Sequence, residues 1–218
     1  MFSFHSITRS ALITVVALTS ATTFANDGEK TITLQDDVTK AELVRLNISA
    51  GDVEVKGNTG NSITAVVTAV CQQENRDNCV QMLKELGWSK KSGAVTELSL
   101  IPATINRYEH VTVKVKLSVP KNKKLEINVS AGELRIDGTS ACLTANLNAG
   151  QLNLHLQQTD IATAQLSAKV GSVRVTTPKD TIEGDRSLLV GADMTFKGVG
   201  LCHTKASVMA GEVHLTAD

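Results

Sequence analysis

Two carboxylates are the side chains in this sequence best suited to catalysis. Asp52 and Glu133 each follow the tripeptide Ser-Ala-Gly. If these segments form adjacent strands, the carboxylates lie about 5 Å apart, near the separation used by a retaining glycosidase. One prediction is therefore a polysaccharide-active enzyme with outward carboxylates on adjacent turns of chain. A sugar site also needs aromatic platforms, and after residue 25 the only aromatic residues are Trp88, Tyr108 and Phe196.

We therefore favour a solvated acidic surface and predict a protein that is not an enzyme and has no catalytic residue. The histidines stand apart in the chain, whereas a metal needs convergent ligands, so we expect no metal and no cofactor. The charges balance at 22 basic and 22 acidic residues, which disfavours a nucleic-acid partner. Lysines in the segment PKNKK, residues 120–124, could contact an anionic cell-wall polymer, but such a short lysine loop is more often only a loop.

The N-terminal segment has the features of an export signal. Arg9 precedes an apolar run over residues 11–22, and small residues at Thr23 and Ala25 precede Asn26. The run is shorter than the roughly 20 apolar residues that span a bilayer. We predict a cleaved signal peptide over residues 1–25 and a mature domain over residues 26–218. The mature protein should be periplasmic or secreted, with no membrane span.

Single glycines in the sequence indicate bent strands that would position these side chains. In INVSAGELRI, residues 127–136, the apolar positions are odd-numbered before Gly132 and even-numbered after it. Side chains of a strand alternate between its two faces, so this slip would turn the inner face outward unless the chain bends there. Glycine permits such a bend because it reaches backbone angles closed to other residues.

The same pattern recurs along the chain. From Gly132 onward the glycines are 18, 21, 20 and 20 residues apart. This period predicts an all-β, single-domain β-solenoid with stacked coils of about 20 residues. At Gly191 the aliphatic residues that should follow the glycine are displaced, and Asp193 stands at the second position after it. The predicted structural glycines are Gly51, Gly132, Gly150, Gly171, Gly191 and Gly211.

An insertion separates the first coil from the second. We place it at residues 58–124, with alternating strand patterns over residues 62–71, 94–100 and 110–119. Residues 78–88 have apolar side chains at helical spacing and predict one short helix. The insertion should form a small sheet and helix beside the coils, with the Gly51 coil near the Gly132 coil.

The four cysteines favour disulfides in an exported chain. Cys71 and Cys79 flank a loop, and we predict a bond between them. Cys142 and Cys202 lie three coils apart in the chain, which is roughly 14 Å if coils stack in order. Bridged Cα atoms lie within about 7 Å, so we predict that Cys142 and Cys202 are not bonded to each other.

The last coil has almost no chain after it. Since the end of a stack exposes strand edges and apolar core, we expect a second copy or another envelope protein to cover the C-terminal coil. The C-terminal coil is thus a predicted site of self-association or of binding to an envelope protein.

Several segments resemble bacterial exported domains of unknown function known as "putative adhesins", including the "head GIN" type. The similarity covers roughly residues 40–218 and rests on VTVKVKLSVP, the lysine loop, LEINVSAGELRIDG, LTANLNAGQLNL, LSAKVGSVRV and ASVMAGEVHL. The resemblance implies a β-solenoid and a non-catalytic envelope protein that presents a surface to a protein or polymer partner.

Overall fold

The described chain is built almost entirely from strands. The computed structural model describes residues 21–26, 28–72, 76–140, 142–187 and 190–218. The strands form one 14-stranded sheet, and the described ranges contain a single α-helix, α1 (Arg76–Glu85). The fold is all-β, as the sequence predicts.

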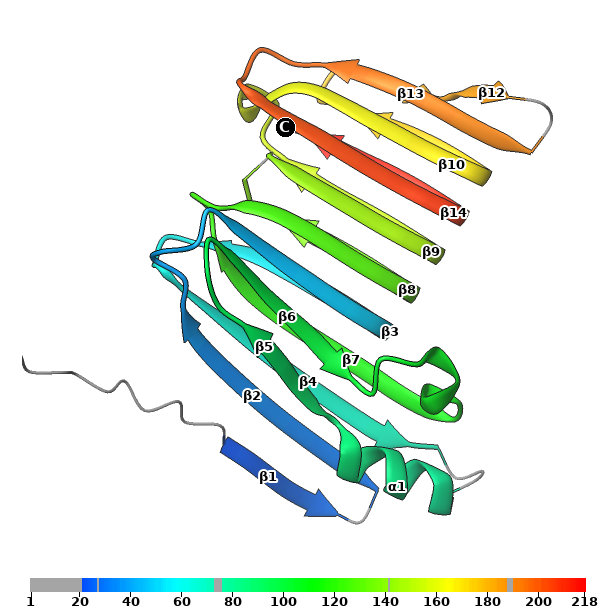
Figure 1. Cartoon of the computed structure of the whole chain (residues 1–218). Helices are drawn as coiled ribbons and strands as arrows, with labels where there is room; N and C mark the ends of the chain where they lie inside the picture. The colour runs from blue at the N-terminus through cyan, green and yellow to red at the C-terminus, as the bar shows by residue number, and fades with distance from the viewer. Residues whose placement is uncertain (1–20, 27, 73–75, 141, 188–189) are drawn as a thin grey trace, which may run out of the picture.

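Five long strands make up the middle of the sheet, and each is bent at a glycine. The strand doubles back there, so that the sheet has two layers (Figure 1). The bend glycines have φ angles from 126° to 142°, which glycine adopts readily and other residues rarely do. The strands are β3 (Leu43–Asn58), β8 (Lys124–Asp137), β9 (Leu143–Leu156), β10 (Ile161–Thr176) and β14 (Cys202–Ala217), bent at Gly51, Gly132, Gly150, Gly171 and Gly211.

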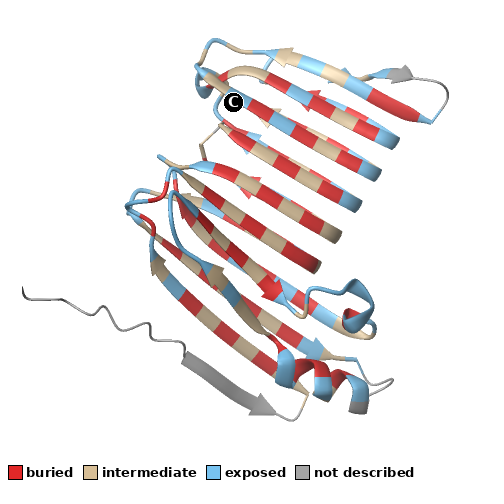
Figure 2. Cartoon of the chain, viewed as in Figure 1, coloured by how far each residue is buried: buried red, intermediate tan, exposed pale blue. Residues whose placement is uncertain are grey.

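The slip in the apolar pattern keeps both halves of each strand in contact with one interior. In β3, Leu46 and Ile48 are buried before the bend, and Val53 and Val55 are buried after it. Even-numbered residues therefore face the core on one side of Gly51 and odd-numbered residues on the other. The alternation of buried and exposed side chains is visible along every bent strand (Figure 2).

The bend glycines stack on one another, and this is why no other residue fits there. Gly132 pairs with Gly51 and with Gly150 in adjacent strands. A Cβ atom on Gly150 would lie 1.8 Å from the carbonyl oxygen of Gly132, far inside any van der Waals contact. The bends therefore form a continuous ridge of backbone.

The bent strands do not stack in chain order. They are parallel and in register, but their order is β3-β8-β9-β14-β10. The C-terminal strand β14 lies between β9 and β10, which are consecutive in the sequence. The expectation that successive coils lie on one another is therefore wrong for the last part of the chain.

A tight crossing lets the chain insert β14 at this place. The segment between β13 and β14 passes over the start of β10, where the Gly200 amide donates to the Ile161 carbonyl oxygen over 2.8 Å. A Cβ atom on Gly200 would lie 2.2 Å from the carbonyl carbon of Asp160. Glycine is needed because any side chain would keep the crossing segment away from β10.

Gly191 differs from the other predicted bend glycines. It begins β13 (Gly191–Lys197), which pairs antiparallel with the first half of β10, and its φ is not positive. The prediction of a sixth equivalent bend is therefore wrong. The physical reason is the displaced pattern: Asp193 and Thr195 replace the aliphatic residues that a second inward-facing half would need.

The insertion extends both layers instead of forming a separate small sheet. β6 (Val95–Ile101) pairs with β3 before its bend, and β7 (Val111–Pro120) pairs with β3 after it. The helix predicted over residues 78–88 forms as α1 over residues 76–85, whereas Gly87 and Trp88 begin a strand. The remaining elements are β1 (Ala21–Asn26), β2 (Glu29–Asp37), β4 (Ser62–Cys71), β5 (Gly87–Lys91), η1 (Ile105–Tyr108), η2 (Gln158–Asp160), β11 (Thr181–Glu183) and β12 (Asp185–Ser187).

The interior is a thin aliphatic layer shared by neighbouring strands. Leu147 pairs with Val129 on one side and Val208 on the other, and all three are at most 3% exposed. Burial of one such side chain contributes about 1.5–3 kcal/mol. Each bent strand therefore depends on its two neighbours for its share of the core.

Both cysteine pairs are bonded. Cys71 and Cys79 join β4 to α1, with Cα atoms 5.7 Å apart. Cys142 and Cys202 are also bonded, with Cα atoms 4.5 Å apart, so the prediction that they do not pair is wrong. The estimate of three coils assumed chain order, whereas the insertion of β14 beside β9 makes these cysteines neighbours.

The C-terminal strand is not an open end of the sheet. β14 pairs along its length with β9 on one side and β10 on the other. The expectation that a second copy covers the C-terminal coil is therefore wrong, because strands of the same chain cover both of its edges. Among the described residues, no helix has the length and hydropathy required to cross a bilayer.

Candidate functional site

The two carboxylates singled out in the sequence lie on adjacent strands. Asp52 of β3 pairs with Glu133 of β8, directly after the bend glycines. They line a surface hollow of about 250 Å³ that also contains side chains of both charges: Glu54, Lys114, Lys116 and Arg135. The structure thus brings the predicted acids together, but it surrounds them with cations.

Neighbouring side chains engage Glu133 and Glu54. Arg135 donates to both carboxylate oxygens of Glu133, over 2.6 and 2.8 Å, and Asn153 donates a third hydrogen bond over 3.0 Å. Lys56 lies 2.6 Å from Glu54 and lowers the pKa of that carboxyl. A glycosidase requires a carboxylic acid that can give up a proton. Here Glu133 is held by the Arg135 guanidinium and the Asn153 amide, so the geometry favours a surface ion-pair array.

His155 is the histidine with the most acidic surroundings. Its Nδ1 lies 3.1 Å from Oδ1 of Asp137 on β8, and its Nε2 is hydrogen bonded to the side chain of Asp218 at the end of the chain. The bond to Asp218 raises the pKa of His155, with a smaller contribution from Asp137. This contact ties the C-terminus to the sheet surface.

His214 and His203 have hydrogen-bond partners of their own, away from His155. His214 Nε2 lies 2.9 Å from the Thr176 hydroxyl, and burial lowers the pKa of His214, assisted by the nearby Arg174. His203 Nδ1 lies 2.7 Å from the Thr163 hydroxyl. In the described ranges, His, Cys, Asp and Glu form no group of three or more that could hold a metal ion.

The lysine loop has a structural role. Lys123 Nζ donates to the carbonyl oxygens of Thr39 and Ala41, over 2.9 and 2.7 Å. The Lys121 amide donates to the Asn58 carbonyl oxygen over 2.9 Å. These bonds attach the loop to the segment that precedes β3 and to the last residue of β3, so Lys123 is engaged within the chain.

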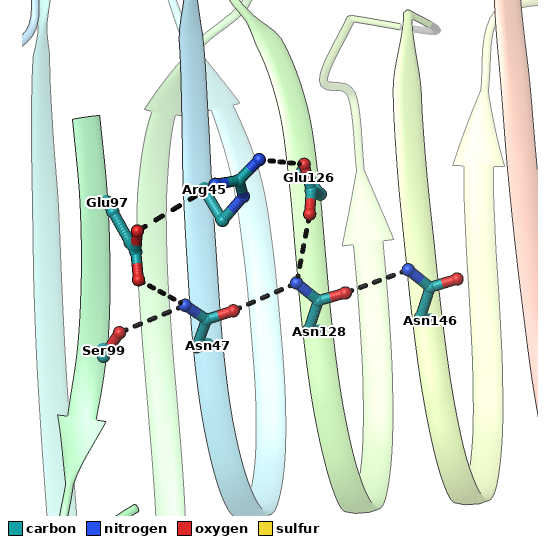
Figure 3. Close-up of polar contacts among 7 residues, drawn as sticks. All are labelled: Arg45, Asn47, Glu97, Ser99, Glu126, Asn128 and Asn146. Atoms are coloured by element: carbon teal, nitrogen blue, oxygen red, sulfur yellow. Dashed lines mark hydrogen bonds and ion pairs between the residues drawn. The ribbon is translucent and has the colours of Figure 1, made fainter. Parts of the chain in front are cut away.

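A polar feature that the sequence reasoning missed crosses the outer face of the other layer. Asn146 Nδ2 donates to Asn128 Oδ1 over 2.9 Å, and Asn128 Nδ2 donates to Asn47 Oδ1 over 3.0 Å. Asn47 Nδ2 continues to Ser99 Oγ over 3.1 Å, and Ser207 Oγ donates to Asn146 Oδ1 over 2.7 Å. We call this row, shown in part in Figure 3, the amide ladder. It connects β6, β3, β8, β9 and β14.

The amide ladder forms the floor of a groove of about 390 Å³. One wall comes from the end of β6 and the segment that follows it. The groove is lined by Asn47, Ile48, Ser49, Ser99, Leu100, Ala103, Asn128, Val129, Ser130, Asn146 and Asn148. The side chains exposed to it are mainly amides and hydroxyls and include no charged group, whereas Ile48, Leu100 and Val129 border it but are at most 3% exposed. An amide oxygen has two lone pairs, so each ladder oxygen can accept one further hydrogen bond from a molecule in the groove.

A charged cluster beside the groove fixes the ladder. Arg45 Nη2 donates to Glu126 over 2.9 Å, and Arg45 Nη1 lies 3.9 Å from Glu97. Arg45 lowers the pKa of Glu126 through this hydrogen bond. Glu97 then accepts from Asn47 over 3.1 Å, and Glu126 accepts from Asn128 over 3.4 Å. The ladder amides are therefore oriented before any ligand arrives (Figure 3).

A signal for the ladder is present in the sequence. Asn47, Asn128 and Asn146 each stand four residues before a bend glycine, and Ser207 stands four residues before Gly211. The residues four positions before each bend glycine therefore contain the signal for the ladder, whereas the carboxylates stand directly after the glycines.

Comparisons with known proteins give a fold and no closer relationship. No protein-family model matches this chain, and no curated protein matches it. Among solved structures, the chain is similar to a "putative cell adhesion protein" from Clostridium sporogenes, with 12% identity, a TM-score of 0.50 and coverage of 87% of this chain and 100% of the other. This similarity shows that the two chains share a fold.

Two further structures match over different lengths. A "putative adhesin" from Bacteroides fragilis has 10% identity, a TM-score of 0.26 and coverage of 87% of this chain and 97% of the other. A "putative adhesin" from Parabacteroides distasonis has 12% identity, a TM-score of 0.29 and coverage of 59% and 61%. The fold shared with the Clostridium sporogenes protein is the finding that agrees with the resemblance noted in the sequence.

Proposed function

We propose that this protein is a non-catalytic, adhesin-like envelope protein whose bent strands form a β-solenoid scaffold. The scaffold presents the amide-ladder groove to a protein or polymer partner. The observation that carries this proposal is the ladder itself: polar side chains in one register on five strands, hydrogen bonded and oriented by flanking carboxylates. A groove whose donors and acceptors are already oriented loses less conformational entropy when a ligand binds.

The proposal includes export. Residues 1–25 are removed as a signal peptide, and residues 26–218 form one domain with an insertion over residues 58–124. The two disulfides fit an oxidising compartment such as the periplasm or the cell exterior. The fold shared with the cell adhesion protein from Clostridium sporogenes supports an adhesin-like role.

Asn146→Val tests the groove. Valine suits a strand and removes both ladder bonds that Asn146 makes. Each such bond contributes about 0.5–1.5 kcal/mol, so the loss of the oriented floor should weaken binding to envelope polymers and envelope proteins by about tenfold. Binding is measured by retention of the mature protein on immobilised envelope fractions.

Asn153→Val is the matched control. Asn153 lies on the same strand, β9, but after the bend, where it donates to Glu133 over 3.0 Å. The control should bind like the unchanged protein. Equal retention of both variants, or equal loss in both, would contradict the assignment of binding to the groove.

A further inference from the structure

The open end of the sheet lies at its N-terminal side. There, β1 pairs antiparallel with β2, with Ala21 opposite Thr33 and Thr23 opposite Thr31. Residues 21–25 belong to the segment that the proposed export step removes. In the mature chain, β2 therefore loses its outer partner, and a nine-residue strand presents unpaired backbone donors and acceptors.

We propose that two copies of the mature chain join through antiparallel pairing of their β2 strands, in the position that β1 occupies before processing. This inference rests on the proposed removal of residues 1–25. Pairing between identical antiparallel strands has twofold symmetry, so the contact closes at a dimer. The structure already shows that this edge accepts an antiparallel strand.

A twofold axis at Thr33 pairs the apolar positions of β2 with each other, and at the ends of the strand it places Glu29 opposite Asp37 of the second copy. In EKTITLQDD, a twofold axis at Thr33 places Ile32 opposite Leu34 of the second copy and Thr31 opposite Gln35. Ile32 and Leu34 are 6% and 8% exposed and face the interior, whereas Thr31 and Thr33 face outward. The pairing therefore continues the apolar face of one sheet into the other.

Other registers are less favourable. A shift by one residue would oppose inward-facing and outward-facing side chains. A twofold axis at Ile32 would place Lys30 opposite Leu34 of the second copy. The axis at Thr33 instead places Lys30 opposite Asp36, and both are already held in their own chain. Lys30 Nζ donates to the carbonyl oxygens of Leu83 and Leu86 at the end of α1, over 2.7 and 2.9 Å. Asp36 accepts from Lys90 over 2.8 Å.

The opposite end of the sheet is protected in a way that β2 is not. It finishes in β11 and β12, each three residues long, and short edge strands are a common defence against pairing with another chain. A long and regular edge such as β2 has no such defence once β1 is gone. At the two ends of the described path of paired strands the edges therefore differ, and β2 offers the longer edge for strand addition.

The oligomeric state provides the first test. Light scattering after size exclusion should give twice the chain mass for residues 26–218 at micromolar concentration. A chain of residues 21–218, which retains β1, should remain a monomer because its edge is covered. A strict monomer for residues 26–218 at 100 micromolar would overturn the proposal, and so would an equally stable dimer for residues 21–218.

A cysteine variant tests the register. The four native cysteines are all in disulfides, so Thr33→Cys would add the only free thiol. With the axis at Thr33, the two new cysteines face each other with Cα atoms about 4.5–5.5 Å apart, within disulfide range. Most of the Thr33→Cys protein should run as a covalent dimer on a non-reducing gel.

Gln35→Cys is the matched control. With the axis at Thr33, the two copies of residue 35 are displaced by four residues along the strands, about 13 Å, and cannot bond. Crosslinking at position 35 in place of position 33 would overturn the register. The intact mass of the exported protein tests the processing step separately, so failure of export and failure of strand pairing give different results.

Discussion

The Cys142–Cys202 bond gives the sharpest test of the strand order. This bond joins β9 to β14 and closes a loop with a sequence separation of 60 residues, whereas Cys71–Cys79 spans only 8. A cross-link restricts the unfolded chain more when its loop is longer. The loop-entropy relation gives about 4 kcal/mol for the longer loop and about 2.5 kcal/mol for the shorter one.

Replacing both members of each pair with serine turns this difference into a measurement. Urea unfolding without reductant should show a free energy of unfolding lower by about 4 kcal/mol in Cys142→Ser/Cys202→Ser. The free energy of unfolding of the matched variant Cys71→Ser/Cys79→Ser should fall by about 2.5 kcal/mol, which is about 1.5 kcal/mol less. Because β14 lies between β9 and β10, the larger loss should appear as one cooperative transition of the whole stack.

Peptide mapping of the unreduced protein supplies an independent check. A peptide that links Cys142 to Cys202 is expected, since their strands are neighbours. If this peptide is absent, the insertion of β14 between β9 and β10 is refuted. If the Cys71 pair proves the more stabilising of the two, the loop-entropy reasoning is refuted.

Two further predictions follow from the bends and from the C-terminus. Gly150→Ala should lower the free energy of unfolding by about 3 kcal/mol, because its φ is +132° and the new Cβ would lie 1.8 Å from the Gly132 carbonyl oxygen. Gly93→Ala, where the nearest atom is 3.7 Å away, should change it by less than about 0.5 kcal/mol in the same urea assay; equal losses would contradict the stacked bends. The raised pKa of His155 stabilises the folded state below the unfolded pKa of about 6.5, and this contribution is lost as the pH rises through the folded pKa. Asp218→Asn should therefore lower the pKa of His155 in an NMR titration, and an unchanged titration would show that Asp218 does not hold it.

Part of the candidate site could be predicted from single strands. The pairing of Asp52 with Glu133 follows from the equivalence of their glycine motifs, and the structure places them on adjacent strands. Their chemistry could not be predicted, because the fork from Arg135 and the bond from Asn153 depend on side-chain geometry across strands. The residues after each glycine show which side chains recur and at what spacing. They do not show which side chains form hydrogen bonds or ion pairs with them across strands.

The amide ladder, too, could be predicted only in part from the sequence. Its asparagines occupy one register that is visible in the sequence, four residues before each bend. Their hydrogen bonds run across strands, and their end at Ser99 depends on β6 from the insertion. The ladder forms the floor of a groove because β6 lies beside β3 and supplies one wall.

The sequence alone determined the all-β class, the bends and the aliphatic interior, because these depend on the period of two in a strand and on the backbone freedom of glycine. It could not determine which strand lies next to which. The bent strands have equivalent glycines and similar apolar positions, so any of them fits beside any other, and the local pattern contains no preference for order. The tertiary structure decided the order through the tight glycine crossing before β14 and the bond between Cys142 and Cys202. That order made the C-terminal strand an inner strand of the sheet, paired with β9 on one side and β10 on the other.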